Sequence, residues 1–157
     1  MSKVERASEL KSAWADAEQY DSEVLAERWV EGTEYTVALV ADVALPLIRL
    51  DTPREFYDFE AKYQADSTRY HCPCGLQAEQ ELRLQELARQ AFDAVGASGW
   101  GRVDLFLDTA EQPWLIEVNT VPGMTDHSLV PMAAQAHGWD MQELVWRILE
   151  TSMATVK

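Results

Sequence analysis

Basic residues are few in this chain of 157 amino acids. Lysine and arginine together number 13, whereas aspartate and glutamate number 27, so the formal net charge is −14 at pH 7 with histidine neutral. Proteins that bind phosphate backbones concentrate basic side chains on one face. The excess of negative charge therefore argues against a nucleic-acid partner.

Long apolar runs are missing as well. No segment approaches the roughly 20 apolar residues of a membrane-spanning helix, and the first residues, "MSKVERASEL", do not contain the apolar centre of a signal peptide. We therefore expect no membrane partner and a cytoplasmic location. Hydrophobic residues make up 47% of the chain and charged residues 25%, which is typical of a soluble globular protein.

Cysteine is rare, and both cysteines lie in "HCPCG" at residues 71–75. A disulfide between residues two apart is strained, so a covalent link is not expected. Together with His71 the pair could suggest a zinc site, but adjacent ligands without a distant partner are a weak signal. We expect Cys72 and Cys74 to be reduced residues of a loop.

Apolar residues recur at helical spacing in four segments. Ser2 and Glu5 have the spacing of a capping box ahead of the first segment, and Gly96 is a typical stop for the second. Four helices are expected, at residues 3–20, 77–95, 128–137 and 140–153.

Strand-like segments rich in β-branched and aromatic residues lie between these helices. Ala41 and Asp42 would join two of them as a hairpin, and Pro46 marks either an edge strand or a bulge. Five strands are expected, at residues 23–30, 33–40, 43–50, 101–108 and 113–119. The predicted class is α+β, with a mainly antiparallel sheet and helices packed on it.

Carboxylates and an amide occur at alternating positions of the last two predicted strands. In "GRVDLFLD" Arg102 and Asp104 share one face, and in "PWLIEVN" so do Glu117 and Asn119. The short turn between the strands allows these faces to coincide, which would gather the hard oxygen ligands that Mg²⁺ prefers. The alternative is a solvated, ion-paired face, but the apolar neighbours of these residues favour the metal site.

Four longer stretches resemble D-alanine–D-alanine ligases, which are ATP-grasp enzymes: "ERWVEGTEYTV", "FYDFEAKYQADSTRYHCP", "GWGRVDLFLD" and "EVNTVPGMTDHSLVP". The likeness covers nearly the whole chain, in the family's order, and corresponds to the family's C-terminal half. It implies the C-terminal ATP-grasp domain, with residues 1–34 as a remnant of the small lobe (a helix and the hinge strand). Residues 35–157 would form the C-terminal lobe with the metal and D-alanine sites.

The resemblance implies roles for the residues of the polar face. Asp104, Glu117 and Asn119 would hold two Mg²⁺ (or Mn²⁺) ions, with Glu117 bridging them. Arg102 would contact the transferring phosphate and the acyl group. The N–H of Gly123, in the Pro-Gly turn that follows, would face the developing oxyanion.

Other residues are implied to bind ATP. Glu27 would accept a hydrogen bond from the adenine amino group, the backbone of Trp29 and Val30 would meet the base, and Glu34 would bond the ribose. Without the resemblance, Glu27 and Glu34 have the alternative interpretation of solvated strand residues.

The polar stretch at 51–75 is long for a loop without periodicity and is expected to be functional. By resemblance it is a mobile lid in which Lys62 reaches the phosphates and Tyr63 helps to close the site; on sequence alone both would be ordinary loop residues. Ser128 and Leu129 would receive the carboxylate of the second D-alanine, although Ser128 has the alternative interpretation of a helix cap.

The implied reaction is ATP-dependent ligation of two D-alanines through an acyl phosphate, for peptidoglycan precursors. Because the family's N-terminal half is not represented, we expect the chain to be an inactive or partial ligase by itself. It would associate with itself or with a separate N-terminal half. The alternative is a non-catalytic or split nucleotide-binding module that needs a separate N-terminal chain.

Overall fold

The computed structural model describes residues 1–51 and 68–154, and it divides into two compact units, Met1–Val30 and Glu31–Lys157. Each unit is described by itself. The second contains an antiparallel sheet covered by helices, so the predicted α+β class is confirmed. The structure contains no helix that is long and apolar enough to cross a membrane, as judged over the described residues.

The first unit contains a short helical turn, η1 (Ala7–Glu9), and the helix α1 (Leu10–Glu18). The helix predicted from residue 3 therefore starts later, and the predicted capping box is wrong. Oε2 of Glu9 accepts hydrogen bonds from the backbone N–H groups of Glu5, at 3.1 Å, and Arg6, at 3.2 Å. Because Glu9 binds these donors, the first helical turn forms after Arg6.

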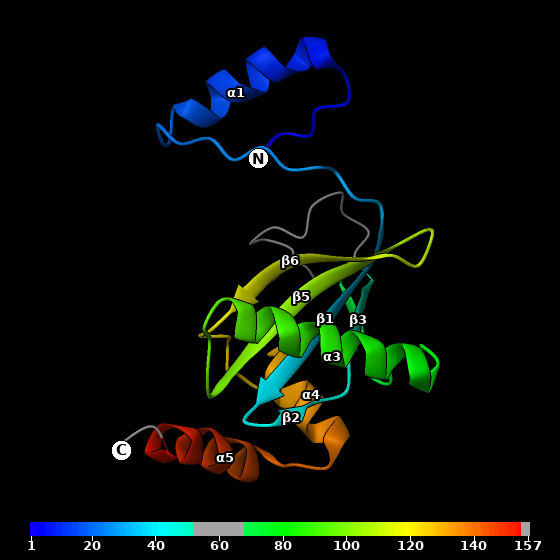
Figure 1. The fold of residues 1–157 in the computed structure, drawn as a ribbon, viewed down its shortest axis with the longest axis vertical. Helices are drawn as coiled ribbons and strands as arrows, with labels where there is room; N and C mark the ends of the chain where they lie inside the picture. The colour runs from blue at the N-terminus through cyan, green and yellow to red at the C-terminus, as the bar shows by residue number, and fades with distance from the viewer. Residues whose placement is uncertain (52–67, 155–157) are drawn as a thin grey trace. The chain divides into compact units, whose positions relative to one another are not determined.

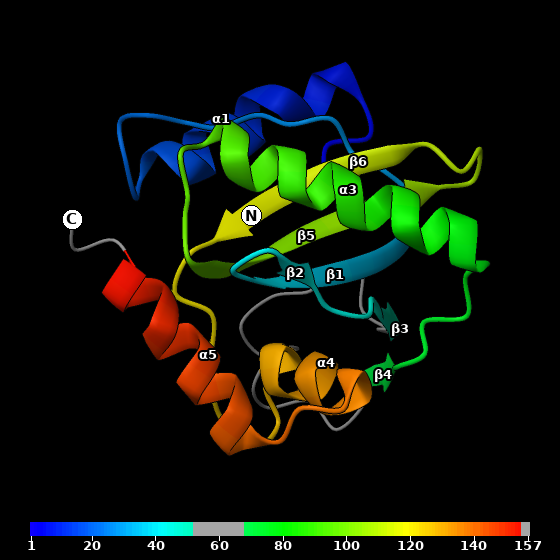
Figure 2. The ribbon, with the colours of Figure 1, turned by 60° about the horizontal axis from the view of Figure 1, so that its bottom comes forward.

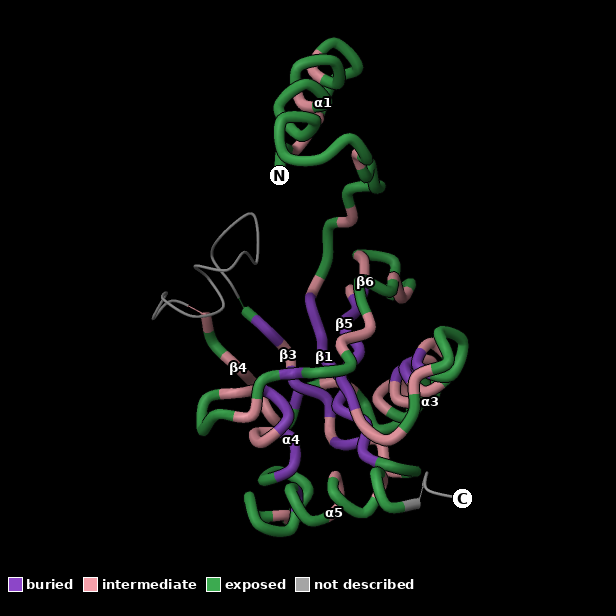
Figure 3. Tube along the Cα trace, turned by 90° about the vertical axis from the view of Figure 1, so that its left-hand side faces the viewer, coloured by how far each residue is buried: buried purple, intermediate pink, exposed green. Residues whose placement is uncertain are grey.

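Residues 23–30 were predicted as a strand, and this prediction is wrong: they contain no regular secondary structure. Leu25 is 81% exposed, and no described residue of the first unit is buried, as the colouring of α1 and its neighbours in Figure 3 shows. A strand is stabilised by hydrogen bonds to a neighbouring strand. The described residues provide no neighbouring strand for residues 23–30, so a strand-like composition alone does not make this segment a strand.

The second unit is built on a six-stranded sheet in which all pairs are antiparallel (Figure 1). The order is β4-β3-β1-β5-β6, and β2 pairs with β1 at the hairpin end. The strands are β1 (Gly32–Val40), β2 (Val43–Ala44), β3 (Ile48–Asp51), β4 (Arg69–His71), β5 (Trp100–Asp108) and β6 (Pro113–Asn119).

Pro46 interrupts the strand predicted over 43–50, which becomes the separate strands β2 and β3. Among the described residues, strand β2 pairs with β1 alone, whereas β3 lies between β4 and β1, so the edge-strand interpretation of Pro46 holds for β2 but is wrong for β3, and an interruption separates the two. The break leaves backbone groups without a strand partner, and side chains of the next helix bind them. Glu81 accepts from the N–H of Leu47 at 2.9 Å, and Gln85 donates to the carbonyl of Leu45 at 3.0 Å.

Strand β4 was not predicted from the sequence, because its residues fall inside the segment predicted as one long loop. The three residues Arg69–His71 pair with β3. Such a short strand has too little periodicity to stand out in a polar sequence. Residues 52–67, which make up most of the expected lid at 51–75, lie outside the described residues.

Helices cover both faces of the sheet (Figure 2). Helix α3 (Ala78–Ala94) packs on one face, and α4 (Leu129–His137) and α5 (Met141–Ala154) pack on the other, close to their predicted ranges. Between sheet and α3 lies a core that includes Val37, Val103, Leu105, Leu84 and Phe92. A second core beneath α4 and α5 includes Ala38, Ile48, Val130, Ala133 and Leu144.

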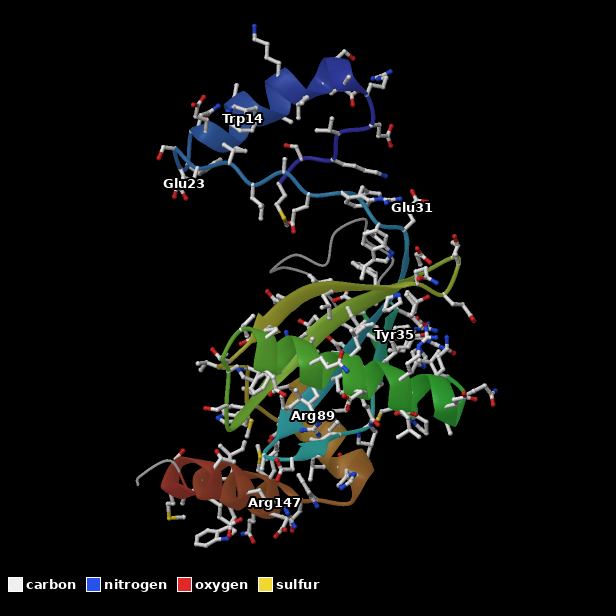
Figure 4. All side chains as sticks on the ribbon, viewed as in Figure 1. Trp14, Glu23, Glu31, Tyr35, Arg89 and Arg147 are labelled. Atoms are coloured by element: carbon white, nitrogen blue, oxygen red, sulfur yellow. The ribbon has the colours of Figure 1, made fainter. Side chains whose placement is uncertain are left out.

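Polar side chains of α3 tie the helix to the β1–β3 connection. In addition to Glu81 and Gln85, Arg89 donates from Nη2 to the carbonyl of Asp42 at 2.6 Å, and Figure 4 labels Arg89 on α3. These three residues lie four apart, on one face of the helix. Each satisfies a backbone group that the interruption at Pro46 or the hairpin leaves unpaired.

Gly101 provides a test of the packing between α3 and the sheet. A β-carbon at this position would lie 2.5 Å from Cε2 of Phe92 and 2.9 Å from the backbone oxygen of Asn119. We expect Gly101→Ala to lower the free energy of unfolding by about 1–3 kcal/mol, because overpacking forces neighbours apart. Urea unfolding followed by circular dichroism measures this. Ser98→Ala, at an exposed position nearby, is the control, and equal stability of both variants would contradict the prediction.

The two cysteines are free thiols, as predicted, and burial raises the pKa of both. Cys74 is 1% exposed, whereas Cys72 is only partly buried. Because the thiolate is the reactive form, a raised pKa slows thiol–disulfide exchange at pH 8. Native protein should therefore react slowly with Ellman's reagent, Cys72 before Cys74, and both should react at once in denaturant. Rapid labelling of Cys74 in the native state would contradict this burial.

Candidate functional site

The polar face predicted on the last two strands exists. In the β5–β6 register Asp104 is opposite Glu117, and Arg102 is opposite Asn119. Residues directly opposite each other in an antiparallel pair point to the same side of the sheet. The prediction that the two faces coincide is therefore confirmed, and they coincide on the side of the sheet that α4 covers.

A register shift lies in the middle of this face. Asp104 is opposite Glu117, but its neighbour Leu105 is opposite Leu115, so Ile116 is an extra residue of β6. Such a β-bulge bends a strand and increases its twist. Simple alternation would put Leu115 and Glu117 on one face, whereas the observed register assigns them to opposite faces.

Arg102 and Asp104 form a buried ion pair. Arg102 donates from Nε to Oδ1 of Asp104 at 2.8 Å and from Nη2 to Oδ2 at 2.7 Å, and only 10% and 7% of the two side chains are exposed. The same Nη2 lies 3.7 Å from Oε1 of Glu117, whose side chain is 47% exposed. Removing one member of a buried ion pair lowers the stability of a protein by more than the pair contributes, because the other charge stays buried without a partner. Arg102 and Asp104 therefore depend on each other.

Strand β1 adds a polar residue that sequence reasoning missed. Thr36 is 3% exposed, lies opposite Asp104, and donates from Oγ1 to Oδ1 of Asp104 at 2.6 Å. Glu34, two residues earlier on the same face, is 8% exposed. Alternation along "TEYTVALV" was the available signal, because it places the hydroxyl of Thr36 beside Glu34 on one face.

The turn after β6 brings Gly123 close to Ser128. A β-carbon on Gly123 would lie 2.9 Å from Oγ of Ser128. That Oγ also accepts from the N–H of Thr125 at 3.0 Å and lies 2.9 Å from Oγ1 of Thr125. Ser128 is the N-cap residue of α4 but makes no side-chain capping bond, so the interpretation as a simple helix cap is wrong. Leu129 is buried in the core beneath α4.

The remaining predicted residues belong to other parts of the chain. Glu27, Trp29 and Val30 belong to the first unit, where Nζ of Lys3 lies 4.6 Å from the centroid of the Trp29 ring. Lys62 and Tyr63 lie outside the described residues.

The donor set on the polar face suits a hard divalent cation. Two carboxylates and the side-chain amide of Asn119 share one face, and the side chain of Glu117 is half exposed to solvent. Oδ1 of Asn119 accepts a hydrogen bond from the N–H of Val121 at 3.1 Å, which fixes the amide. No cluster of three or more histidine, cysteine, aspartate or glutamate side chains suited to a metal occurs in residues 1–51 and 68–154. A site here would depend on the amide.

The D-Ala–D-Ala ligase C-terminus family model matches residues 1–150. The chain belongs to this family. A D-alanine–D-alanine ligase from Methylococcus capsulatus is 64% identical over 154 residues, which are 98% of this chain and 50% of the relative. The ligase from Alkalilimnicola ehrlichii is 62% identical over 149 residues, 95% of this chain and 48% of the relative. The chain spans about half the length of the curated ligases that it matches.

Solved ligase structures share the fold. The D-alanine–D-alanine ligase from Bacillus anthracis complexed with ATP has a TM-score of 0.81 at 32% identity, over 96% of this chain and 48% of that one. The VanG D-Ala:D-Ser ligase from Enterococcus faecalis has a TM-score of 0.81 at 30% identity, over 93% and 43%. The predicted ATP-grasp C-terminal fold of this D-Ala–D-Ala ligase family member is confirmed.

The polar face is tested by cation binding. We expect Glu117→Gln to weaken Mn²⁺ binding by more than about tenfold, because even loss of an outer-shell partner has an effect on that scale. The half-exposed Glu117 can be changed without disturbing the core, so the melting temperature should stay unchanged. Free Mn²⁺ is measured by electron paramagnetic resonance. Glu79→Gln, exposed on α3, is the control of equal charge, and equal weakening by both variants would contradict the site.

Proposed function

We propose that residues 1–157 supply the C-terminal half of a ligase that joins two D-alanines at the expense of ATP. The observation that supports this most strongly is Arg102, a buried cation flanked by Asp104 and Glu117 on the face that also presents Asn119. It occurs in a chain 64% identical to a D-alanine–D-alanine ligase. The product would be a precursor of peptidoglycan, made in the cytoplasm.

Two chemical steps follow from this assignment. One D-alanine carboxylate attacks the terminal phosphate of ATP, giving an acyl phosphate and ADP. The amine of the second D-alanine then attacks the acyl carbon; phosphate leaves with the electron pair of the broken C–O bond, and the amine loses a proton. The acyl phosphate supplies the leaving group that a carboxylate does not have.

The protein residues position and stabilise charge. Arg102 would turn toward the transferring phosphate, and the N–H of Gly123 would donate to the oxyanion at the acyl carbon. Ser128, close to Gly123, and Leu129 would receive the carboxylate of the second D-alanine at the start of α4. Two Mg²⁺ or Mn²⁺ ions held by Asp104, Glu117 and Asn119 would neutralise phosphate charge.

Further residues are assigned to the nucleotide by the resemblance to the family. Glu27, Trp29 and Val30 are assigned to the adenine, Glu34 to the ribose and Lys62 to the phosphates. Tyr63 is assigned to a lid that excludes water from the acyl phosphate. Complex formation with ATP by the Bacillus anthracis relative supports the nucleotide assignment. Residues 1–34 would belong to the small ATP-grasp lobe and residues 35–157 to the C-terminal lobe.

A second candidate is a split module that needs the other half of the family's fold as a partner. Large apolar side chains of the first unit stay exposed, among them Tyr20 at 92% and Leu25 at 81%. A 30-residue unit that buries no described residue does not bury enough apolar surface to fold stably by itself. The half that the relatives contain beyond the matched region is the natural partner for it; self-association is the competing outcome.

Residues 1–157 alone should release phosphate from ATP and D-alanine far more slowly than a complete ligase. Positioning contributes up to about 7–11 kcal/mol of catalysis, and much of the positioning surface is in the other half. Addition of the N-terminal half of the Methylococcus capsulatus ligase as a separate chain should restore D-alanine-dependent release, measured with a coupled phosphate assay.

The same mixture made with Arg102→Met is the control and should stay inactive. Restored activity with D-serine, but not D-alanine, as the second substrate would move the assignment toward the D-Ala:D-Ser ligases. Full dipeptide formation by residues 1–157 alone would contradict the need for the other half. ATP binding without turnover in the mixture would support the non-catalytic module.

A further inference from the structure

A hydroxyl group lies beside the carboxylate at the centre of the polar face. Oγ1 of Thr36 donates to Oδ1 of Asp104 at 2.6 Å, and the two residues are direct cross-strand partners of β1 and β5. Hydroxyl donors to a carboxylate are among the shorter, charge-assisted hydrogen bonds. Thr36 is 3% exposed, so water does not compete readily for this contact. The hydroxyl therefore fixes Oδ1 on the β1 side of the carboxylate.

The other oxygen of Asp104 faces a guanidinium nitrogen. Nη2 of Arg102 lies 2.7 Å from Oδ2 of Asp104 and 3.7 Å from Oε1 of Glu117, so one cationic group contacts one carboxylate and approaches the other. A divalent cation shared by Asp104 and Glu117 would need the same space. Arg102 must then leave Oδ2, and contact with the transferring phosphate gives it a new partner of the right charge.

Departure of Arg102 removes two of the three hydrogen bonds on the Asp104 carboxylate. The torsion of a carboxylate about its last bond is soft, so the group needs a remaining partner to keep its orientation. Among the described residues, Thr36 is the donor that stays.

We propose that Thr36 is the positioning residue that keeps Asp104 oriented as a metal ligand when Arg102 turns to the phosphate. The inference rests on the proposed function, because it requires a cation between Asp104 and Glu117. Its signature is a loss of cation affinity when the hydroxyl is removed without a change of shape. Valine has the shape of threonine and cannot donate a hydrogen bond.

The test measures Mn²⁺ binding to purified residues 1–157 by electron paramagnetic resonance, at fixed salt. Thr36→Val should weaken binding by about tenfold, the lower end for removal of an outer-shell partner of a metal ligand. Thr36→Ser retains the hydroxyl and should bind nearly as the unchanged protein does. Thr33→Val is the matched control on the same strand, because Thr33 is opposite Leu107 on the other face of the sheet.

A second comparison uses Arg102→Met. Removal of the guanidinium from between the two carboxylates should strengthen Mn²⁺ binding in the absence of nucleotide. In this background Thr36→Val should weaken binding by a larger factor than it does alone, because Thr36 is then the remaining donor to Asp104 within the described part of the chain. A threonine that only stabilises the sheet would lower the melting temperature in both backgrounds without changing the Mn²⁺ affinity.

The outcomes separate this inference from the proposed function. If Asp104→Asn and Glu117→Gln bind Mn²⁺ as the unchanged protein does, the metal site itself is wrong. If those two variants lose binding but Thr36→Val does not, the inference about Thr36 is wrong and the metal site stands. Unfolding of both Thr36→Val and Thr36→Ala would also overturn the inference, because the hydroxyl would then serve stability.

Discussion

The carboxylate of Asp104 is the interaction on which the polar face depends. It accepts hydrogen bonds from Thr36 on β1 and from Arg102 on its own strand, and it is opposite Glu117 on β6. One group thus connects three adjacent strands. A carboxylate only 5% exposed is costly unless its partners satisfy it, so this requirement fixes the arrangement of its neighbours.

Helices on both sides of the sheet make this arrangement rigid. Apolar residues of β5 alternate with Arg102 and Asp104, and they point into the core beneath α3. Glycine at 101 allows Phe92 of α3 and the backbone of Asn119 to approach the strand closely. The position of Asn119 therefore depends on how α3 packs on the opposite face of the sheet. This links the stability of the core beneath α3 to the geometry of the site.

Much of the second unit could be predicted from sequence, because β5 alternates strictly and a short turn joins it to β6, whereas the bulge at Ile116 of β6 could not be predicted. Segment 23–30 also has the composition of a strand. A strand forms only where a neighbouring strand is available to pair with it, however, and composition does not show whether one is. Pro46 correctly marked an irregularity, yet the backbone bonds that Glu81 and Gln85 make there cannot be read from a single strand. The alternation of Thr36 with Glu34 was visible in the sequence, but Thr36 was missed because a single threonine in a strand does not by itself indicate a site.

The bulge at Ile116 has a consequence for how this protein tolerates changes of length. Elsewhere in β6, insertion or deletion of one residue would move every later side chain of the strand to the opposite face of the sheet, since side chains alternate with a period of two. At the bulge the extra residue is already accommodated, with Leu115 and Glu117 opposite adjacent residues of β5. A chain shorter by this one residue would form a continuous ladder with the same cross-strand neighbours. At this one point of β6 a residue can be lost without changing which side chains lie on the polar face.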